Sequence, residues 1–366
     1  MKQINILVKP THQCNMRCKY CFHEKYGYSD ELLDVNKFKK FIKLLCGEYD
    51  FINVVWHGGE PLLVPLSFYE EAYDFCNAQN SHFLFTIQTN GTLITQDNID
   101  FFRKRNTNFG LSFDGLTNEY TRSYTIEILN NIKLLQANGF RPGAILVVNQ
   151  KNVFQLIEEY HFFDSMNVGL KLNPIFIDGA AEKNLDVNLN VNDYINNFID
   201  FFKYWMKDTK GKINVATCVE LAKLILYEHT GVCTFNSCLS KWLCLDSDAN
   251  IYPCDRLCTP DYLLGNVDEL SSISDVFDSR NFLKLLKISV QRREQCINNC
   301  EYYKNCYSGC NANAILNYDD KYENGVSCYI HKQILKEIKK YVIDSINSKS
   351  ELNPQYIKIL KNSRNN

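Results

Sequence analysis

Between residues 4 and 177 the chain alternates six times between a short apolar run and a longer segment with apolar residues at helical spacing. This alternation restricts the fold more than any other feature, because strand–helix repeats form parallel strands joined by right-handed crossovers. The sequence therefore predicts an α/β fold, with helix caps at Asp34, Ser67 and Thr95. Strands are predicted at residues 4–8, 52–57, 83–89, 109–113, 144–148 and 170–177, a loop at 179–190, and helices at 36–45, 126–137, 154–163, 194–206, 216–227 and 329–346.

The composition excludes several classes of function. Apolar residues make up 45% of the 366 residues, which is enough for one large domain and a smaller one. The net charge of −2 argues against a nucleic-acid partner, and no apolar run reaches the roughly 20 residues of a membrane helix. Residues 1–12 lack the charged and then apolar layout of a signal peptide, so we expect a cytoplasmic location.

The sixteen cysteines are unevenly distributed along the chain. Eleven fall between Cys218 and Cys328, which without a signal peptide indicates metal or cluster binding and not disulfides. Three others have the spacing C-x3-C-x2-C, and three thiolates leave one iron of a cubane cluster open to substrate or cofactor. Zinc is the alternative, with His12 or His23 as a further ligand. The three cysteines are Cys14, Cys18 and Cys21.

Two further features accompany this cysteine loop. Tyr20 directly precedes the third cysteine, and Gly58-Gly59-Glu60-Pro61 follows the next apolar run. With these features the sequence resembles the radical S-adenosylmethionine (SAM) enzymes. The resemblance implies a partial (β/α)6 barrel of TIM type, in which the open iron of a [4Fe-4S] cluster binds SAM. Reductive cleavage of SAM then gives a 5′-deoxyadenosyl radical, which removes a hydrogen atom from the substrate.

The resemblance also assigns SAM contacts to residues at predicted strand ends, which meet on one face of such a barrel. Glu60 and the two glycines before it would bind the amino group of SAM, since glycine lets a backbone approach a ligand closely. For Gln88 and Ser112 the alternative is an ordinary polar residue at a strand end, and for Arg122 it is a surface arginine. The residues expected to bind SAM are Tyr20, Gly58, Gly59, Glu60, Gln88, Ser112 and Arg122.

The C-terminal cysteines resemble the SPASM extension of radical SAM enzymes, a small domain that holds two auxiliary [4Fe-4S] clusters. The chain would then hold three clusters, with a radical SAM barrel at 1–215, a SPASM domain ending in a helix at 216–345 and a polar tail at 346–366. By this resemblance the first auxiliary cluster takes Cys233, Cys238, Cys254 and Cys310, and the second takes Cys296, Cys300, Cys306 and Cys328.

Some cysteines depart from that pattern. The gap from Cys296 to Cys300 is one residue longer than usual, and Cys244 rivals the favoured Cys238, because a hairpin around 246–250 would bring it toward Cys254. Cys258 has no assigned role. Buried free cysteine behaves as a small hydrophobic residue, and we expect this of the three that fall on apolar helix faces. Those three are Cys46, Cys76 and Cys218.

The pattern is closest to the anaerobic sulfatase-maturating enzymes and their peptide-modifying relatives. In such an enzyme Asp255, directly after Cys254, would take the substrate proton as catalytic base, and a polar loop residue is the alternative. The resemblance implies a peptide or protein substrate and an electron donor such as flavodoxin or ferredoxin.

Three functions are compatible with these residues. The main prediction is an oxidoreductase that crosslinks or oxidises a ribosomally made peptide, because Cys244 and Cys258 depart from the sulfatase-maturase pattern. The alternative is oxidation of a sulfatase Cys or Ser to formylglycine. Asp255 and the cysteine spacings favour it, as does a first strand that begins too early for a leader-binding domain. A non-catalytic cluster- or zinc-binding module is the alternative of another class.

Overall fold

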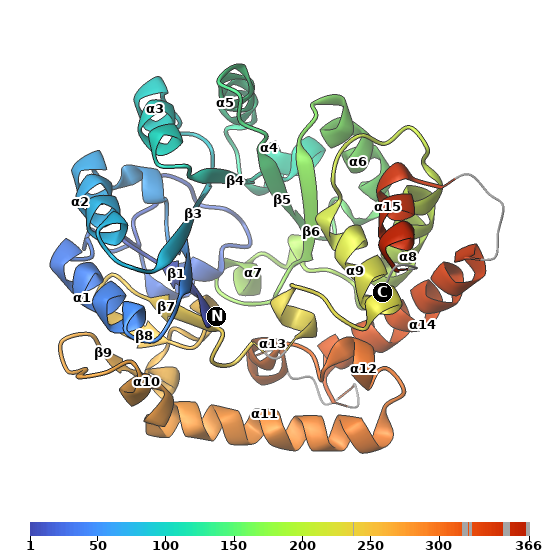
Figure 1. Cartoon of the computed structure of the whole chain (residues 1–366). Helices are drawn as coiled ribbons and strands as arrows, with labels where there is room; N and C mark the ends of the chain where they lie inside the picture. Colours follow the sequence, from blue (N-terminus) through green and yellow to red (C-terminus); the bar gives the residue numbers. More distant parts are fainter. Residues whose placement is uncertain (237, 317–320, 322–323, 347–351, 364–366) are drawn as a thin grey trace. The chain divides into compact units, whose positions relative to one another are not determined.

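The computed structural model describes residues 1–236, 238–316, 321, 324–346 and 352–363 (Figure 1). The chain packs into two compact units. The first is formed by Met1–Ser112, Tyr124–Pro142 and Cys238–Val290, and the second by Phe113–Ser123, Gly143–Ser237 and Gln291–Asn366. These units do not follow the domain boundaries expected from the resemblance, which stay predictions.

The sheet of the first unit carries the strand–helix alternation. Its four N-terminal strands are parallel, in the order β4-β3-β2-β1, and one face of each is buried. On the other side of β1 lies β7, also parallel, and the antiparallel strands β8 and β9 follow it, so the hairpin predicted around 246–250 is confirmed. The strands are β1 (Gln3–Val8), β2 (Phe51–Trp56), β3 (His82–Thr89), β4 (Asn108–Ser112), β7 (Trp242–Leu245), β8 (Asn250–Tyr252) and β9 (Gly265–Asn266).

Two helices of the first unit begin where a side chain caps the first turn. Asp34 accepts the N–H of Asn36, and Thr95 forms a reciprocal capping box with Asn98, as predicted. The cap predicted at Ser67 is wrong, because Pro65 fixes the backbone two residues earlier and the helix begins at Leu66. The helices are α1 (Val35–Cys46), α2 (Leu66–Asn77), α3 (Gln96–Lys104), α5 (Thr125–Ala137) and α10 (Ser274–Asp278).

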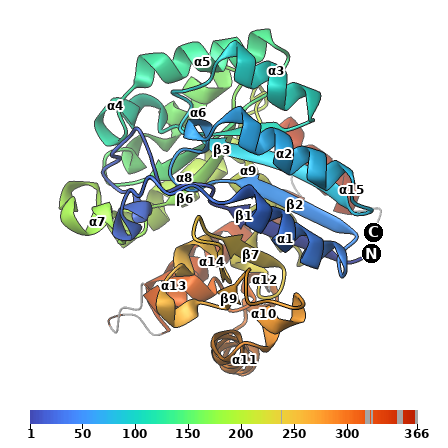
Figure 2. The ribbon, with the colours of Figure 1, turned by 90° about the vertical axis from the view of Figure 1, so that its left-hand side faces the viewer.

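Large apolar side chains form the core of the first unit. Figures 1 and 2 show α1 and α2 on the same side of strands β1–β3. Trp56 of β2 is fully buried there and donates its ring N–H to the hydroxyl of Tyr73 on α2 at 3.2 Å. Cys76 is fully buried on the same helix and Cys46 is half-buried on α1, as expected of small hydrophobic residues.

The second unit continues the alternation with the parallel strands β5 (Gly143–Val148) and β6 (Gly169–Pro174). The last strand is shorter than predicted, because Pro174 lacks the N–H that would extend the ladder. The predicted loop 179–190 contains a short helix, and residues 354–363 of the polar tail form a helix that buries Tyr356.

The helices of the second unit are α4 (Asn118–Thr121), α6 (Leu156–Ser165), α7 (Ala180–Lys183), α8 (Val191–Lys207), α9 (Ala216–Tyr227), α12 (Tyr303–Cys306), α13 (Asn311–Leu316), α14 (Val326–Ile346) and α15 (Pro354–Ser363). A further helix, α11 (Arg280–Asn299), begins in the first unit and ends in the second. None of the described helices combines the length and the apolar character needed to cross a membrane.

Candidate SAM and iron–sulfur sites

The three N-terminal cysteines lie on the loop that follows β1. Cys18 is buried, whereas Cys14 and Cys21 are half-buried. The main-chain N–H of Met16 points at the sulfur of Cys14 at 3.4 Å, and the side-chain amide of Asn90 lies 3.9 Å from the same sulfur. N–H groups directed at sulfur favour the thiolate, which is the form that binds iron. The residues of this loop therefore fit a cluster held by three thiolates.

Gly58 and Gly59 hold this loop from the end of β2. Gly58 has a φ of +111°, and a Cβ there would lie 2.6 Å from the carbonyl oxygen of Thr11. A Cβ on Gly59 would lie 2.0 Å from the carbonyl oxygen of Gln13. The main-chain N–H groups of Gly59 and Glu60 donate to these same two oxygens at 3.0 and 2.7 Å. The close approach that the glycines permit is thus to the backbone that leads into Cys14.

Glu60 is completely buried, and its carboxylate accepts hydrogen bonds from two strand-end loops. The donors are the N–H of Leu62 at 2.9 Å, the hydroxyl of Thr89 at 2.7 Å and the N–H of Asn90 at 2.7 Å. The amide of Asn90 in turn donates to Asn15 on the cysteine loop at 2.8 Å. The predicted strand-end residues are therefore brought together in the first unit, and Glu60 ties β2, β3 and the cysteine loop to one another.

Two other predicted SAM contacts form a pair. The amide of Gln88 on β3 donates to the hydroxyl of Ser112 on β4 at 3.0 Å, and both side chains are half-exposed. Gly110 leaves room for this amide, since a Cβ there would lie 2.3 Å from the side-chain oxygen of Gln88. Tyr20 is buried beside the cysteines, and Arg122 belongs to the second unit. The roles of these residues in SAM binding stay predictions.

Asp255 lies in the turn after β8, between Cys254 and Cys258. The sulfur of Cys254 is 3.3 Å from a carboxylate oxygen of Asp255. The main-chain carbonyl of Asp255 accepts hydrogen bonds from Lys9 and from the hydroxyl of Tyr26, both at 3.2 Å. The predicted base is thus half-buried, and its backbone is held by residues on either side of the N-terminal cysteine loop.

Several buried polar side chains lie near this turn, and the sequence analysis did not predict most of them. His12 lies 2.5 Å from the carboxylate of Asp246, and the rings of His23 and His57 are 5.6 Å apart. Burial lowers the pKa of His57 below its usual range and that of His23 far below it. Burial also lowers the pKa of Lys9, but nearby Cys244, Cys258, Asp246 and Asp255 raise it further, so that this ammonium stays charged.

Sequence reasoning considered His12 and His23 only as zinc ligands. Among the described residues, no three histidine, cysteine or acidic side chains are placed to hold a single metal ion. No motif spacing in the sequence marks Lys9, His57 or Asp246 as a site residue, because each is a single polar residue next to a strand end. Only the pairing of β7 with β1 brings Asp246 to His12.

The comparison with known proteins identifies the N-terminal part of the chain. Residues 8–163 match the family model of the Radical SAM superfamily. The chain carries a radical SAM domain. Enzymes of this superfamily use SAM and a [4Fe-4S] cluster, and the three cysteines and Glu60 lie inside the matched segment.

Two curated relatives extend the similarity beyond the radical SAM domain. The cysteine-type anaerobic sulfatase-maturating enzyme of Clostridium novyi is 27% identical over 363 residues, which cover 92% of this chain and 96% of the relative. The serine-type anaerobic sulfatase-maturating enzyme of Bacteroides thetaiotaomicron is also 27% identical, over 85% of this chain and 83% of the relative.

Solved structures show the same fold. Native anSMEcpe with bound AdoMet has a TM-score of 0.83 at 21% identity and covers 94% of this chain. Streptococcus suis SuiB bound to S-adenosylmethionine has a TM-score of 0.64 at 15% identity and covers 86% of this chain and 74% of its own. The predicted α/β fold of radical SAM type, with a cysteine-rich C-terminal region, is therefore confirmed.

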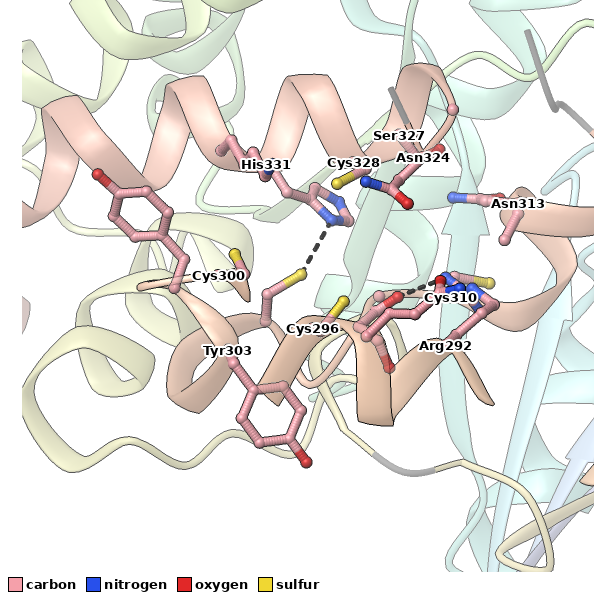
Figure 3. Close-up of a pocket in the computed structure, with 18 of the residues that line it drawn as sticks. Arg292, Cys296, Cys300, Tyr303, Cys310, Asn313, Asn324, Ser327, Cys328 and His331 are labelled. Atoms are coloured by element: carbon pink, nitrogen blue, oxygen red, sulfur yellow. Dashed lines mark hydrogen bonds between the residues drawn. The ribbon is translucent and has the colours of Figure 1, made fainter. Parts of the chain in front are cut away.

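The second unit of the chain holds another group of cysteines (Figure 3). They lie in the last turn of α11 and directly after it, on α12, just before α13 and in the first turn of α14. Figure 3 shows the thiols of Cys296, Cys300 and Cys328 around one space, with the sulfur of Cys310 lying apart from them. The residues that line this pocket include Cys296, Cys300, Cys306, Cys310, Cys328, Arg292 and His331.

Four of these thiols lie close enough to affect one another's ionisation. Burial, together with the thiols of Cys328, Cys296 and Cys300, raises the pKa of Cys306 to about 12. Neighbouring thiols that oppose one another's ionisation are held together most readily by a bound cation, so the donor set fits an iron–sulfur cluster. His331 lies with Nδ1 3.6 Å from the sulfur of Cys306, and burial lowers its pKa to about 4. Its ring is therefore neutral.

Arg292 supplies the positive charge of this pocket. It lies one helical turn before Cys296 on α11 and donates to the side chain of Asn311 at 2.8 Å and to the carbonyl oxygen of Ser308. A fixed guanidinium here offsets the negative charge that thiolates and cluster would bring. Sequence reasoning missed Arg292 and His331, which have no motif of their own and follow only from the helix spacing to their cysteines.

The four cysteines predicted for the first auxiliary cluster belong to different units. Cys238 and Cys254 are half-buried in the first unit, whereas Cys233 and Cys310 are in the second. Their ligand roles stay predictions. Cys244, the rival of Cys238, is fully buried on β7, with its sulfur 3.7 Å from that of Cys258.

Proposed function

We propose that this radical SAM enzyme oxidises a cysteine or serine side chain of a sulfatase to formylglycine without oxygen. The observation that carries the proposal is the similarity to cysteine-type and serine-type sulfatase-maturating enzymes over 92% and 85% of the chain. This similarity includes the cysteine-rich region as well as the radical SAM domain. It favours the protein substrate of those relatives over the peptide crosslinking that the sequence analysis preferred.

The environment of two cysteines supports the same choice. Crosslinking was preferred because Cys244 and Cys258 depart from the sulfatase-maturase pattern. Both side chains are buried, they contact each other, and Tyr252 packs with them in one apolar cluster. Cys258 also accepts a hydrogen bond from Lys9 at 3.1 Å. Their departure from the pattern therefore has a reason in local packing and requires no different substrate.

We further propose three [4Fe-4S] clusters. Cys14, Cys18 and Cys21 hold the cluster that binds SAM, and the thiols of Cys296, Cys300, Cys306 and Cys328 hold the second auxiliary cluster. The first auxiliary cluster takes Cys233, Cys238, Cys254 and Cys310. Around SAM, Gly58, Gly59 and Glu60 shape the loop beside the open iron, and Tyr20, Gln88, Ser112 and Arg122 complete the contacts.

In this proposal a residue of the chain accepts the proton that the substrate loses. When bound, SAM supplies the acceptor for the hydrogen atom and the auxiliary clusters accept one electron. In a cysteine substrate, the Cβ–H bond breaks, the thiol proton passes to the carboxylate of Asp255, and a C=S bond forms. Water then replaces sulfur to give the aldehyde and hydrogen sulfide. A base must lie within hydrogen-bond reach of the reacting group, and we assign this role to Asp255, whose carboxylate lies beside the sulfur of Cys254.

The experiment is an anaerobic incubation of the reconstituted enzyme with SAM, dithionite and three sulfatase-type peptides. The peptides carry Cys, Ser or Ala at the target position and are otherwise identical. We expect an aldehyde, captured with a hydrazide reagent and identified by mass spectrometry, in the Cys or Ser peptide and none in the Ala peptide. Release of 5′-deoxyadenosine with no aldehyde from any peptide would refute the sulfatase proposal but not the radical chemistry.

We propose partners and a location that accord with this function. The substrate is a peptide segment of a sulfatase, the electron donor is a small protein such as flavodoxin or ferredoxin, and the reaction takes place in the cytoplasm. A pull-down with the Cys peptide, with the Ala peptide as control, tests the first partner. Replacing dithionite with reduced flavodoxin or ferredoxin in the same assay tests the second.

A further inference from the structure

Lys9 is a lysine with no exposed surface, placed directly after β1. Its ammonium donates to the sulfur of Cys258 at 3.1 Å and to the carbonyl oxygen of Asp255 at 3.2 Å. The same ammonium lies 4.6 Å from the centre of the Tyr26 ring. Burying an ammonium is unfavourable unless acceptors surround it, so these contacts are the reason that a lysine can occupy this position.

Tyr26 reaches the same carbonyl from the other side of the cysteine loop. Its hydroxyl donates to the carbonyl oxygens of Asp255 and Arg256 at 3.2 and 3.3 Å. Lys9 precedes Cys14 and Tyr26 follows Cys21, so the two ends of the N-terminal cysteine loop converge on one peptide group. Two donors from different segments restrain a carbonyl more than either does alone.

The surroundings strengthen this restraint. Cys258, Cys244 and Tyr252 form an apolar cluster against which the side chains of Leu7, Tyr26 and Leu263 pack. The three residues of this cluster are buried, and hydrogen bonds are electrostatically stronger where the local dielectric is low. Cys258 closes the turn that begins at Cys254, since its sulfur lies 3.5 Å from the carbonyl oxygen of Cys254.

We propose that Lys9 and Tyr26 are positioning residues for Asp255. They fix the backbone of Asp255 to both ends of the loop that carries the three N-terminal cysteines, and so set the place of its carboxylate relative to the site where the radical forms. This inference rests on the proposed function, in which Asp255 takes the substrate proton. It gives Cys258 a role as the second acceptor of the Lys9 ammonium, which explains a cysteine outside the cluster pattern.

The test separates hydrogen abstraction from the later loss of the proton. Lys9→Met removes the ammonium, Tyr26→Phe removes only a hydroxyl, and Lys25→Met is the matched control. Lys25 is an exposed lysine of the same segment, and its ammonium donates to the carbonyl oxygen of Arg256 at 3.4 Å. The readout is the ratio of 5′-deoxyadenosine released to aldehyde formed, measured in variants with wild-type iron content.

A misplaced base lets SAM cleavage proceed without product. We therefore expect the ratio to rise about tenfold or more in Lys9→Met, less in Tyr26→Phe, and to stay within about twofold in Lys25→Met. A merely structural role would lower iron content, SAM cleavage and product together and leave the ratio unchanged. If Lys9→Met does not bind iron, the test rests on Tyr26→Phe. A ratio of 5′-deoxyadenosine to aldehyde in Tyr26→Phe equal to that in Lys25→Met overturns the proposal.

A second readout does not depend on the substrate. Hydrogen–deuterium exchange of the cluster-loaded enzyme should quicken at residues 254–258 in Lys9→Met and Tyr26→Phe, with β1 and β2 unchanged. Unchanged exchange at 254–258 would overturn the positioning role even if the aldehyde forms. If the wild-type enzyme forms no aldehyde while exchange quickens as expected, the proposed function fails and the restraint on Asp255 stands.

Discussion

The carboxylate of Glu60 accepts the main-chain N–H of Asn90 at 2.7 Å, although 30 residues separate them in the chain. Asn90 also donates to Asn15 and approaches the sulfur of Cys14. Glu60 thereby connects the end of β2 to the end of β3 and, through Asn90, to the cysteine loop. Three protein donors, on Leu62, Thr89 and Asn90, bind this carboxylate, which gives the acidic residue a structural role besides any contact with SAM.

Glu60→Gln should destabilise the protein and weaken SAM binding together. A carboxylate accepts from all three donors, whereas an amide group must turn its NH2 toward at least one of them. One buried donor then lacks a partner, which costs about 1–3 kcal/mol in the free energy of unfolding. Denaturant unfolding of the apoprotein measures the first effect, and equilibrium dialysis of SAM with the reconstituted enzyme measures the second.

The control for this substitution is Glu31→Gln, which changes an exposed glutamate near the same loop. Its unfolding free energy and SAM affinity should match those of the wild type. If Glu60→Gln weakens SAM binding with no loss of stability, the carboxylate acts mainly on the ligand and our structural interpretation of Glu60 is wrong.

The fold could be predicted from sequence wherever local pattern and tertiary packing agree. Asp34 and Thr95 cap helices as their side chains allow, and the six-fold alternation gives parallel strands. Ser67 failed as a cap because the fixed φ of Pro65 starts the helix first. The contact of Lys9 with Asp255 could not be predicted, because it depends on β7 pairing with β1 across more than 200 residues of chain.

Replacing Cys14, Cys18 and Cys21 together by Ala should abolish SAM cleavage. The open iron is lost with its cluster, whereas the predicted auxiliary ligands are untouched. Iron should fall from about twelve to about eight per chain, and the low-temperature EPR signals of the reduced auxiliary clusters should persist. Continued release of 5′-deoxyadenosine would show that the N-terminal loop does not hold the cluster that binds SAM.

A pair of single substitutions decides between Cys238 and Cys244 as cluster ligand. Cys244 is fully buried in the apolar cluster that it forms with Cys258 and Tyr252, so its thiol has no exposed side on which to hold a cluster. Cys238 is half-buried at the start of the segment that leads into β7. We expect Cys238→Ala to lose about four irons per chain and Cys244→Ala to lose none. The opposite result would make Cys244 the ligand.

Arg292 should raise the reduction potential of the second auxiliary cluster. Reduction adds negative charge, and the guanidinium beside the four thiols stabilises the reduced state. Arg292→Met should therefore lower the midpoint potential by tens of millivolts, roughly, with Arg292→Lys closer to the wild type. A spectroelectrochemical titration of the triple variant without the SAM cluster measures this. Arg293→Met is the control, because Arg293 does not line the pocket.

The free energy of unfolding should fall as pH rises, because Glu159 is protonated in the folded state. This glutamate is completely buried on α6, where its carboxylate accepts the N–H of Leu116 at 3.0 Å, and burial raises its pKa from 4.5 to about 8. The folded state therefore holds a proton that the unfolded chain releases above pH 4.5. The stabilisation is fully present below that pH and is lost as pH rises through about 8, by at most a few kcal/mol, roughly.

Glu159→Gln keeps the shape of the side chain and removes its titration. Its free energy of unfolding should change less than that of the wild type between pH 5 and pH 8.5, about the window set by the two pKa values. Glu158→Gln, which alters the exposed neighbour, should retain the wild-type slope. Denaturant unfolding of apoprotein at several pH values measures the slopes. Parallel slopes for the wild type and Glu159→Gln would mean that Glu159 ionises in the folded protein as it does in the unfolded chain.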